Sequence, residues 1–402
     1  MKGGSCLDNR LLMKTAIKNV LLMIFVIVIS FAIKHYNSLA ISASNTQDEK
    51  AYYNKLTKDN DNNQTKTKKA NKSVLKQLQD QYLIIKKPKG DDLQIQLQDL
   101  YINRSLKIII SGYMDEIIDG DYISRVYKEE KFIGEPDYVE VDTSENDEDG
   151  LESSDPIRDY GNDPVHEITI SSQSDNLGYR EYEILLKLNH VYAHILYEDD
   201  NNYYIDLRRP KDVYDKILVI DAGHGGKDPG ALSKDGNTYE KEINIKILSA
   251  LKELIDNDDI KVYYTRLSDE TIFLRPRFTL ANEVDCDFFI SIHCNASTST
   301  RPNGTEILYY DHEHKDIKTV DFAGILSEEI SKIVPLKNNG LVRMQNNDIF
   351  ILRNAKVPAV IIEAGYMTNN NDLKYLKSAA GQEDIAKGIY NGILRAYEEL
   401  IP

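Results

Sequence analysis

The sequence predicts an α/β protein whose C-terminal domain, residues 213–402, is a sheet with helices on both faces. A smaller β-rich domain, residues 76–212, precedes it. From Tyr82 to Leu207 the chain has short runs of alternating apolar and polar residues, the pattern of half-buried strands. From Lys216 onward, continuous aliphatic runs alternate with amphipathic stretches of helical period, which is typical of strands covered by helices on both sides.

Residues 1–43 are predicted to be a signal peptide or an N-terminal membrane anchor. An uncharged apolar run covers residues 20–33. It is preceded by four basic residues, Lys2, Arg10, Lys14 and Lys18. The run suits a signal peptide and is short for a membrane span of about 20 residues. In both cases the rest of the chain is expected outside the cytoplasm, because the positive charge stays inside.

Residues 44–75 are rich in Asn, Lys, Asp, Gln and Thr and predict a disordered polar linker. The strands expected in the β-rich domain are Leu93–Leu97, Leu106–Ile110, Glu167–Ser171, Tyr182–Leu188, Ala193–Tyr197 and Tyr203–Leu207. The fourth and fifth of these are expected to pair as a hairpin, with Asn189 and His190 near the turn. Residues 135–159 hold eleven acidic residues and one basic residue, which predicts a solvated loop; the spacing of a calcium loop is missing.

In the C-terminal domain, strands and helices alternate in the pattern. The expected strands are Ile217–Ile220, Lys261–Thr265, Phe288–His293, Thr305–Tyr310 and Ala359–Ala364. The expected helices are Glu242–Leu254, Arg275–Glu283, Ile317–Ile333 and Ile385–Leu400.

The composition argues against nucleic acid as a partner and against a disulfide framework. The formal net charge is −16 and the pI is near 5.0, so nucleic acid, which requires a basic surface, is not expected as a partner. The three cysteines, Cys6, Cys286 and Cys294, are too few and too unevenly placed for a disulfide framework.

Three short stretches begin where a β-branched run ends: Asp221–Gly230, Ser291–Ala296 and Ile361–Asn369. They carry His224, His293 and Glu363. Parallel strands bring their C-terminal ends to one edge of a sheet, so we expect these side chains to meet there. With Glu240, which opens the helix after the Gly-rich loop, the two histidines offer the donor set of a hydrolytic zinc site.

Glu363 is the expected catalytic residue. A carboxylate at the end of the apolar run Val357–Ile362 is costly unless it is paired or close to a metal. It would accept a proton from the attacking water and return it to the leaving nitrogen. A structural salt bridge to Arg353 or Lys356 is the alternative.

Other residues compete for the role of metal ligand. Glu242 rivals Glu240, but the helical period turns it roughly 200° away. Cys294 follows His293 directly, and neighbours on a strand point to opposite faces. His312 and His314 lie in a polar loop, where solvated histidines are ordinary.

Five blocks in this order resemble the zinc-dependent N-acetylmuramoyl-L-alanine amidases of the type-3 class, the cell-wall hydrolases of bacteria and their phages. The blocks are Gly223–Gly230, Glu240–Glu242, Leu274–Asn282, Ser291–Ala296 and Glu363–Asn369. The resemblance covers Lys216 to Tyr397 and implies a mixed sheet of about six strands with helices on both faces. It also implies one Zn²⁺ held by His224, Glu240 and His293, with Glu363 as the catalytic carboxylate.

The implied substrate is peptidoglycan, cleaved between N-acetylmuramic acid and the first L-alanine of the stem peptide. The protein would act at the cell wall, secreted or anchored to the cytoplasmic membrane by residues 20–33. The β-rich domain is placed like the wall-targeting domains that precede many such amidases. Two alternatives stay open: an inactive wall-binding or sensor protein, and a zinc peptidase that cuts within the stem peptide.

Overall fold

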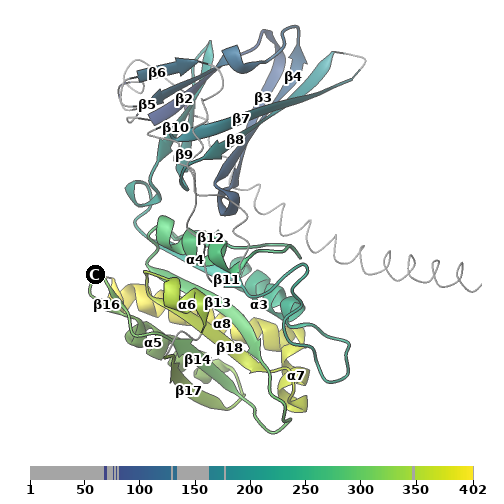
Figure 1. Cartoon of the computed structure of the whole chain (residues 1–402), viewed down its shortest axis with the longest axis vertical. Coiled ribbons are helices and arrows are strands. Elements are labelled where there is room, and N and C mark those ends of the chain that lie inside the picture. The colour runs from purple at the N-terminus through teal and green to yellow at the C-terminus, as the bar shows by residue number, and fades with distance from the viewer. Residues whose placement is uncertain are drawn as a thin grey trace, which may run out of the picture. The chain divides into compact units, whose positions relative to one another are not determined.

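The computed structural model describes residues 81–127, 130–133, 163–175, 178–345 and 349–401, with residues 68, 69, 76 and 78 (Figure 1). A β-rich part is followed by a part in which strands and helices alternate, which confirms the predicted fold class. The N-terminal segment 1–43, with its apolar run 20–33, and the acidic loop 135–159 lie outside the described residues. No helix in the described part of the chain is long and apolar enough to span a membrane.

The predicted linker 44–75 also lies outside the described residues, except at Lys68–Lys69. These two residues form the short strand β1, which pairs in parallel with β9 (Ala193–Glu198). For the rest of residues 44–75 the linker stays a prediction. Two exposed lysines give no apolar alternation, so the sequence held no signal for a strand there.

The strands of the β-rich part form two sheets. The first has the order β1-β9-β10-β2-β5-β6, and the second has the order β3-β4-β8-β7. Their bounds are β2 Gln81–Lys86, β3 Gly90–Leu100, β4 Ser105–Met114, β5 Ile123–Tyr127, β6 Glu130–Ile133, β7 Val165–Ser174, β8 Tyr179–Leu188 and β10 Asn202–Arg208. Short 3₁₀ turns lie at Tyr101–Asn103, Gly120–Tyr122 and Pro210–Asp212.

Both sheets contribute to one hydrophobic core. In β8, Tyr182, Ile184 and Leu186 are buried while the residues between them are partly exposed, as the period of two requires. They belong to the same apolar cluster as Leu83 and Ile85 of the other sheet. The alternating runs of the sequence therefore mark inward-facing positions of two layers.

The predicted hairpin between residues 182–188 and 193–197 is wrong. β8 already has a neighbour along each edge, because it pairs with β4 and with β7. β9 pairs instead with β10 in the other sheet. Tyr192 of the connection is buried in the shared core, so the chain crosses between the two sheets here rather than turning back.

The C-terminal part is built on a six-stranded mixed sheet of order β12-β11-β13-β18-β14-β17. Strands β12, β11, β13 and β18 are parallel, whereas β14 runs antiparallel to β18 and β17 runs parallel to β14. The bounds are β11 Ile217–Ala222, β12 Lys261–Tyr264, β13 Phe288–Asn295, β14 Thr305–Tyr309, β17 Asn338–Arg343 and β18 Ala359–Tyr366.

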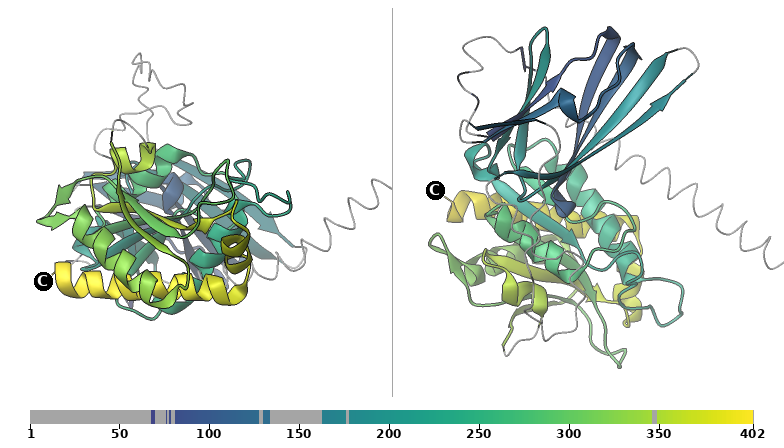
Figure 2. Two further views of the ribbon diagram at one scale, coloured as in Figure 1. Left: turned by 90° about the horizontal axis from the view of Figure 1, so that it is seen from below. Right: turned by 45° about the horizontal axis from the view of Figure 1, so that its top comes forward.

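Helices cover both faces of this sheet. Their bounds are α3 Glu240–Ile255, α4 Leu274–Glu283, α5 Thr319–Ile333, α6 Phe350–Asn354, α7 Asn370–Leu376 and α8 Ala379–Leu400. Apolar residues of α3, α5 and α8 share a core with Ile290 and Ile292 of β13, and those of α4 and α6 share another with Phe289. Figure 2 shows α8, the long yellow helix, running beside α5.

Several details of this part differ from the sequence prediction. Helices α6 and α7 were not expected, and α8 begins at Ala379, six residues before the expected start. The helix expected from Ile317 begins at Thr319, because Ile317–Lys318 form strand β16 against β15 (Glu313–His314). Strand β17 was not expected. It lies at the sheet edge, and its exposed residues interrupt any apolar run.

Candidate metal centre

Adjacent parallel strands β11, β13 and β18 place their C-terminal ends at one edge of the sheet. The Gly-rich loop follows β11, His293 lies near the end of β13, and Glu363 lies near the end of β18. The structure thus brings together the segments that the sequence predicted would meet.

His224 lies in the loop after β11 with a φ of 63°, a left-handed conformation that non-glycine residues rarely adopt. The preceding glycine makes room for the second histidine. A Cβ atom on Gly223 would lie 2.2 Å from the His293 ring. A Cβ on Gly230 would lie 2.6 Å from His224 Cδ2 and 2.7 Å from Glu240 Oε2. These two glycines are therefore required for the side chains to converge.

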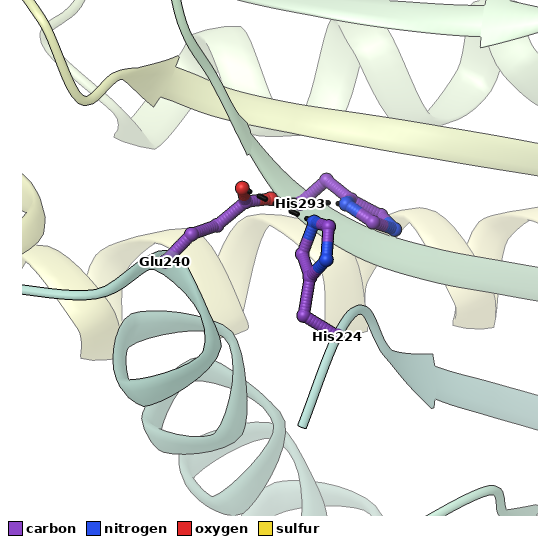
Figure 3. Close-up of side chains that lie close together, drawn as sticks. All are labelled: His224, Glu240 and His293. Carbon is purple, nitrogen blue, oxygen red and sulfur yellow. Dashed lines mark hydrogen bonds and ion pairs between the residues drawn. The ribbon is translucent and has the colours of Figure 1, made fainter. Parts of the chain in front are cut away.

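Glu240 is the first residue of α3, and its carboxylate contacts both imidazoles (Figure 3). Its Oε2 is 3.1 Å from His224 Nε2, and its Oε1 is 2.9 Å from His293 Nδ1. The backbone amides of Ala231 and Cys294 donate to it at 2.8 and 3.0 Å. Burial raises the pKa of Glu240, but the hydrogen bonds and positive charge of the imidazoles outweigh it and hold that pKa far below its ordinary value.

The donor atoms of His224, Glu240 and His293 all lie within 4.8 Å of one another. The imidazole rings meet edge to face, with centroids 4.8 Å apart. Two imidazole nitrogens and one carboxylate are the donors that zinc uses in hydrolytic sites. Moreover, His224 Nδ1 lies 2.8 Å from Asp228 Oδ2, an outer contact that leaves Nε2 directed toward Glu240. These residues fit a zinc ion.

Glu363 lies opposite His293 in the register of β13 and β18. Its Oε2 is buried and has no hydrogen-bond partner among the described residues. Burial raises the pKa of Glu363 to about 7; the Glu240 and Glu306 carboxylates add to this effect, and the His293 and His224 imidazoles oppose it. A carboxyl group with this pKa can both take up and release a proton near neutral pH.

The competing candidates have other partners. Cys294 is buried, its Sγ lies 3.5 Å from Asn244 Oδ1, and burial raises the pKa of its thiol well above the usual range. His314 Nε2 lies 2.9 Å from Asp285 Oδ1, and His312 Nε2 lies 2.8 Å from the Lys356 carbonyl oxygen. Among the described residues, the group that could hold a metal ion is His224, Glu240 and His293.

Some residues around the centre were not predicted. Asp228 had a local signal, since it lies four residues after His224 in the same Gly-rich loop. Glu306 had none: it comes from β14, pairs in register with Glu363, and accepts a hydrogen bond from Asn295 Nδ2 at 2.5 Å. Its place depends on the antiparallel direction of β14, which the sequence pattern alone does not reveal.

Residues 218–395 match the family described as N-acetylmuramoyl-L-alanine amidase. The chain is similar to the N-acetylmuramoyl-L-alanine amidase CwlM of Bacillus licheniformis, with 35% identity over 182 residues, covering 45% of this chain and 68% of CwlM. It is also similar to LytC of Bacillus subtilis, with 27% identity over 185 residues, covering 46% of this chain. The similarity spans only 36% of the length of LytC.

Among solved structures, the chain is similar to the catalytic domain of CwlV, an N-acetylmuramoyl-L-alanine amidase from Bacillus (Paenibacillus) polymyxa var. colistinus. The identity is 30% and the TM-score 0.42, with 46% of this chain and 98% of CwlV covered.

Proposed function

This chain belongs, through residues 218–395, to the N-acetylmuramoyl-L-alanine amidase family, and from that membership we propose a zinc-dependent hydrolase of peptidoglycan. The bond cleaved would be the amide between N-acetylmuramic acid and L-alanine. The observation that carries the proposal is Glu363, a carboxyl group with one buried, unpartnered oxygen beside the His224, Glu240 and His293 group. An inactive wall-binding protein would have no need to keep this costly group.

In this proposal His224, Glu240 and His293 hold the metal. A bound zinc ion would polarise the scissile carbonyl and lower the pKa of water. Glu240 remains anionic over a wide pH range, because its pKa is held low. The contact of Asp228 with His224 Nδ1 fixes the imidazole tautomer and so directs Nε2 toward the ion.

Glu363 moves the proton. It accepts a proton from the attacking water at the carboxylate and then donates it to the nitrogen of the leaving L-alanine. A pKa raised by burial supports both halves of this transfer, because neither protonation state is strongly favoured near neutral pH. The carboxylate comes from the strand beside the one that carries His293, directly opposite that residue in the register.

We also propose that the protein acts at the cell wall, outside the cytoplasm, with peptidoglycan as its partner. The basic residues ahead of the apolar run 20–33 support export by a signal peptide or retention by a membrane anchor. A wall-targeting role for the β-rich part is proposed from its position ahead of the family region.

The test is digestion of purified peptidoglycan by the zinc-loaded chain, with the products separated and their new amino termini identified. Glu363→Gln is the matched variant, since it keeps the shape of the side chain and removes the proton acceptor. New N-terminal alanine on free stem peptides, lost in the variant and with chelator, supports the amidase. New termini inside the stem peptide would show a peptidase, and absence of any cleavage by the metal-loaded chain would favour an inactive wall-binding protein.

A further inference from the structure

A buried carboxylate lies three residues before His224 in the chain. Asp221, at the end of β11, has no exposed surface and accepts hydrogen bonds from three side chains. Thr265 Oγ1 and Ser291 Oγ donate at 2.5 Å each, and Arg277 Nη1 donates at 2.6 Å. Burial raises the pKa of Asp221, but the Arg277 charge and the hydroxyl donors outweigh it and keep the group ionised. Ser291 lies two residues before His293 on the same face of β13, so Asp221 ties two ligand-bearing segments together.

Arg277, on α4, extends this contact to the loop of the first histidine. Its side chain is nearly fully buried, at 2% exposure. Besides Asp221, it donates to the carbonyl oxygens of Ala222 at 2.9 Å, His224 at 2.8 Å and Ile272 at 2.8 Å. The guanidinium therefore holds the backbone of the candidate ligand His224 by a direct hydrogen bond.

Arg266, two residues after the end of β12, makes similar contacts with the helix that carries Glu240. It too is 2% exposed. Its guanidinium donates to the carbonyl oxygens of Ala222 at 2.8 Å, Gly223 at 3.0 Å, Lys241 at 3.1 Å and Ser268 at 3.0 Å. One side chain thus joins the loop before His224 to the residue after Glu240.

We propose that Arg266 and Arg277, together with Asp221, are positioning residues of the metal centre, setting the ligand spacing before the ion arrives. The proposal rests on the proposed function, because it concerns the zinc ligands. His224 has a left-handed backbone that its own chemistry disfavours, so it must be held by its surroundings. The bonds from Arg277 and Arg266 fall on the carbonyls of residues 222, 223 and 224, the turn that enters this conformation.

The geometry needs arginine and not merely a positive charge. Each guanidinium donates in several directions within one plane, whereas an ammonium group is a compact point charge. A lysine at position 277 could still neutralise Asp221 but would lose the fixed fork that also reaches the His224 and Ile272 carbonyls. Arg277→Lys therefore separates positioning from charge.

The experiment measures Zn²⁺ affinity of the whole chain by competition with a chromophoric chelator, at a temperature well below unfolding of the metal-free protein. Arg277→Lys and Arg266→Lys should lower the affinity about 10- to 100-fold, as loss of outer contacts to metal ligands does. They should also change the visible spectrum of bound Co²⁺, which reports ligand geometry. Arg125→Lys is the matched control, a buried arginine paired with Asp163 at 2.8 Å in the β-rich part, and should change neither.

The proposal is overturned if Arg277→Lys and Arg266→Lys bind zinc as tightly as the unaltered chain, with the same Co²⁺ spectrum, even when they unfold at lower temperature. If these variants do not fold, the proposal is tested with Ser291→Ala and Thr265→Val, because each removes one hydrogen-bond donor to Asp221. They should weaken zinc binding by about 2- to 10-fold, the value of one hydrogen bond, and unchanged affinity contradicts the proposal. Failure of the unaltered chain to bind zinc is a distinct result that overturns the proposed metal function and this inference with it.

Discussion

Glu363 lies directly opposite His293 across the β13–β18 ladder, so the carboxylate and the imidazole project from the same face of the sheet. Neighbouring strands are about 4.8 Å apart. Glu363 therefore sits one strand away from the three converging donors and does not belong to the group that they form. This separation is the arrangement expected when one set of residues holds an ion and another moves a proton.

Replacement of the Glu363 carboxylate should separate catalysis from metal binding. We expect Glu363→Gln to lower kcat by about 10²- to 10⁴-fold, the usual contribution of a general acid–base group. Zinc content, measured by atomic absorption, should stay at the level of the unaltered chain. Loss of zinc in this variant would place Glu363 among the ligands instead.

Removal of the ion should abolish activity reversibly. We expect dialysis against a chelator to stop peptidoglycan hydrolysis and added Zn²⁺ to restore it, because Glu363 alone cannot polarise the carbonyl. His224→Ala, His293→Ala and Glu240→Ala should bind little zinc and should not recover. His314→Ala serves as the control, since His314 contacts Asp285 away from the centre; its zinc content should be unchanged.

A methyl group at position 223 should disrupt the centre through sterics alone. Gly223→Ala would place its Cβ 2.2 Å from the His293 ring, well inside contact distance. We expect severe loss of zinc affinity in isothermal titration. Gly236→Ala is a useful comparison, because a Cβ there meets nothing within 4 Å, although its φ of 71° adds backbone strain. Equal zinc binding by Gly223→Ala and the unaltered chain would argue against the described position of His293.

The stability of the metal-free protein should depend on pH through Glu363. Burial raises the pKa of this group to about 7 in the folded state, above its ordinary value of 4.5. Between these two values the folded state binds more protons at Glu363 than the unfolded state, so the contribution of Glu363 to stability is fully present below pH 4.5 and is lost as the pH rises toward 7. The loss reaches about 3 kcal/mol for this shift.

Glu363→Gln cannot ionise and should therefore lack this part of the pH dependence. The check is urea denaturation of both metal-free proteins at several pH values, with the difference in free energy of unfolding plotted against pH. The free energy of unfolding of the unaltered chain, relative to that of the variant, should fall steadily from pH 4.5 to 7. A flat difference would show that the Glu363 carboxyl has an ordinary pKa.

Much of the C-terminal fold could be predicted because its signals are local. The aliphatic run that ends at Asp221 and the helical period after Glu240 require no knowledge of distant residues. The parallel order of strands then carries His224 and His293 to one edge, which is why the converging group could be expected.

What could not be predicted depends on pairing partners. The sequence after β8 gives no sign that this strand is already paired with β4 and β7 along its two edges, so the hairpin prediction was wrong. Arg266 and Arg277 look like surface residues in the sequence, since arginine is rarely buried. Their role appears only when carbonyl groups from the end of β11 and from the loop after it accept their hydrogen bonds.

The hydrogen bonds of Glu240 have a consequence for how the ion enters. Burial lowers the pKa of His224, but the neighbouring Glu240 and Asp228 carboxylates outweigh it and raise that pKa above its ordinary value. A metal ligand must be a neutral imidazole, so a raised pKa makes protons stronger competitors of zinc at His224. Acidification would accordingly strip the ion from this protein much as a chelator does.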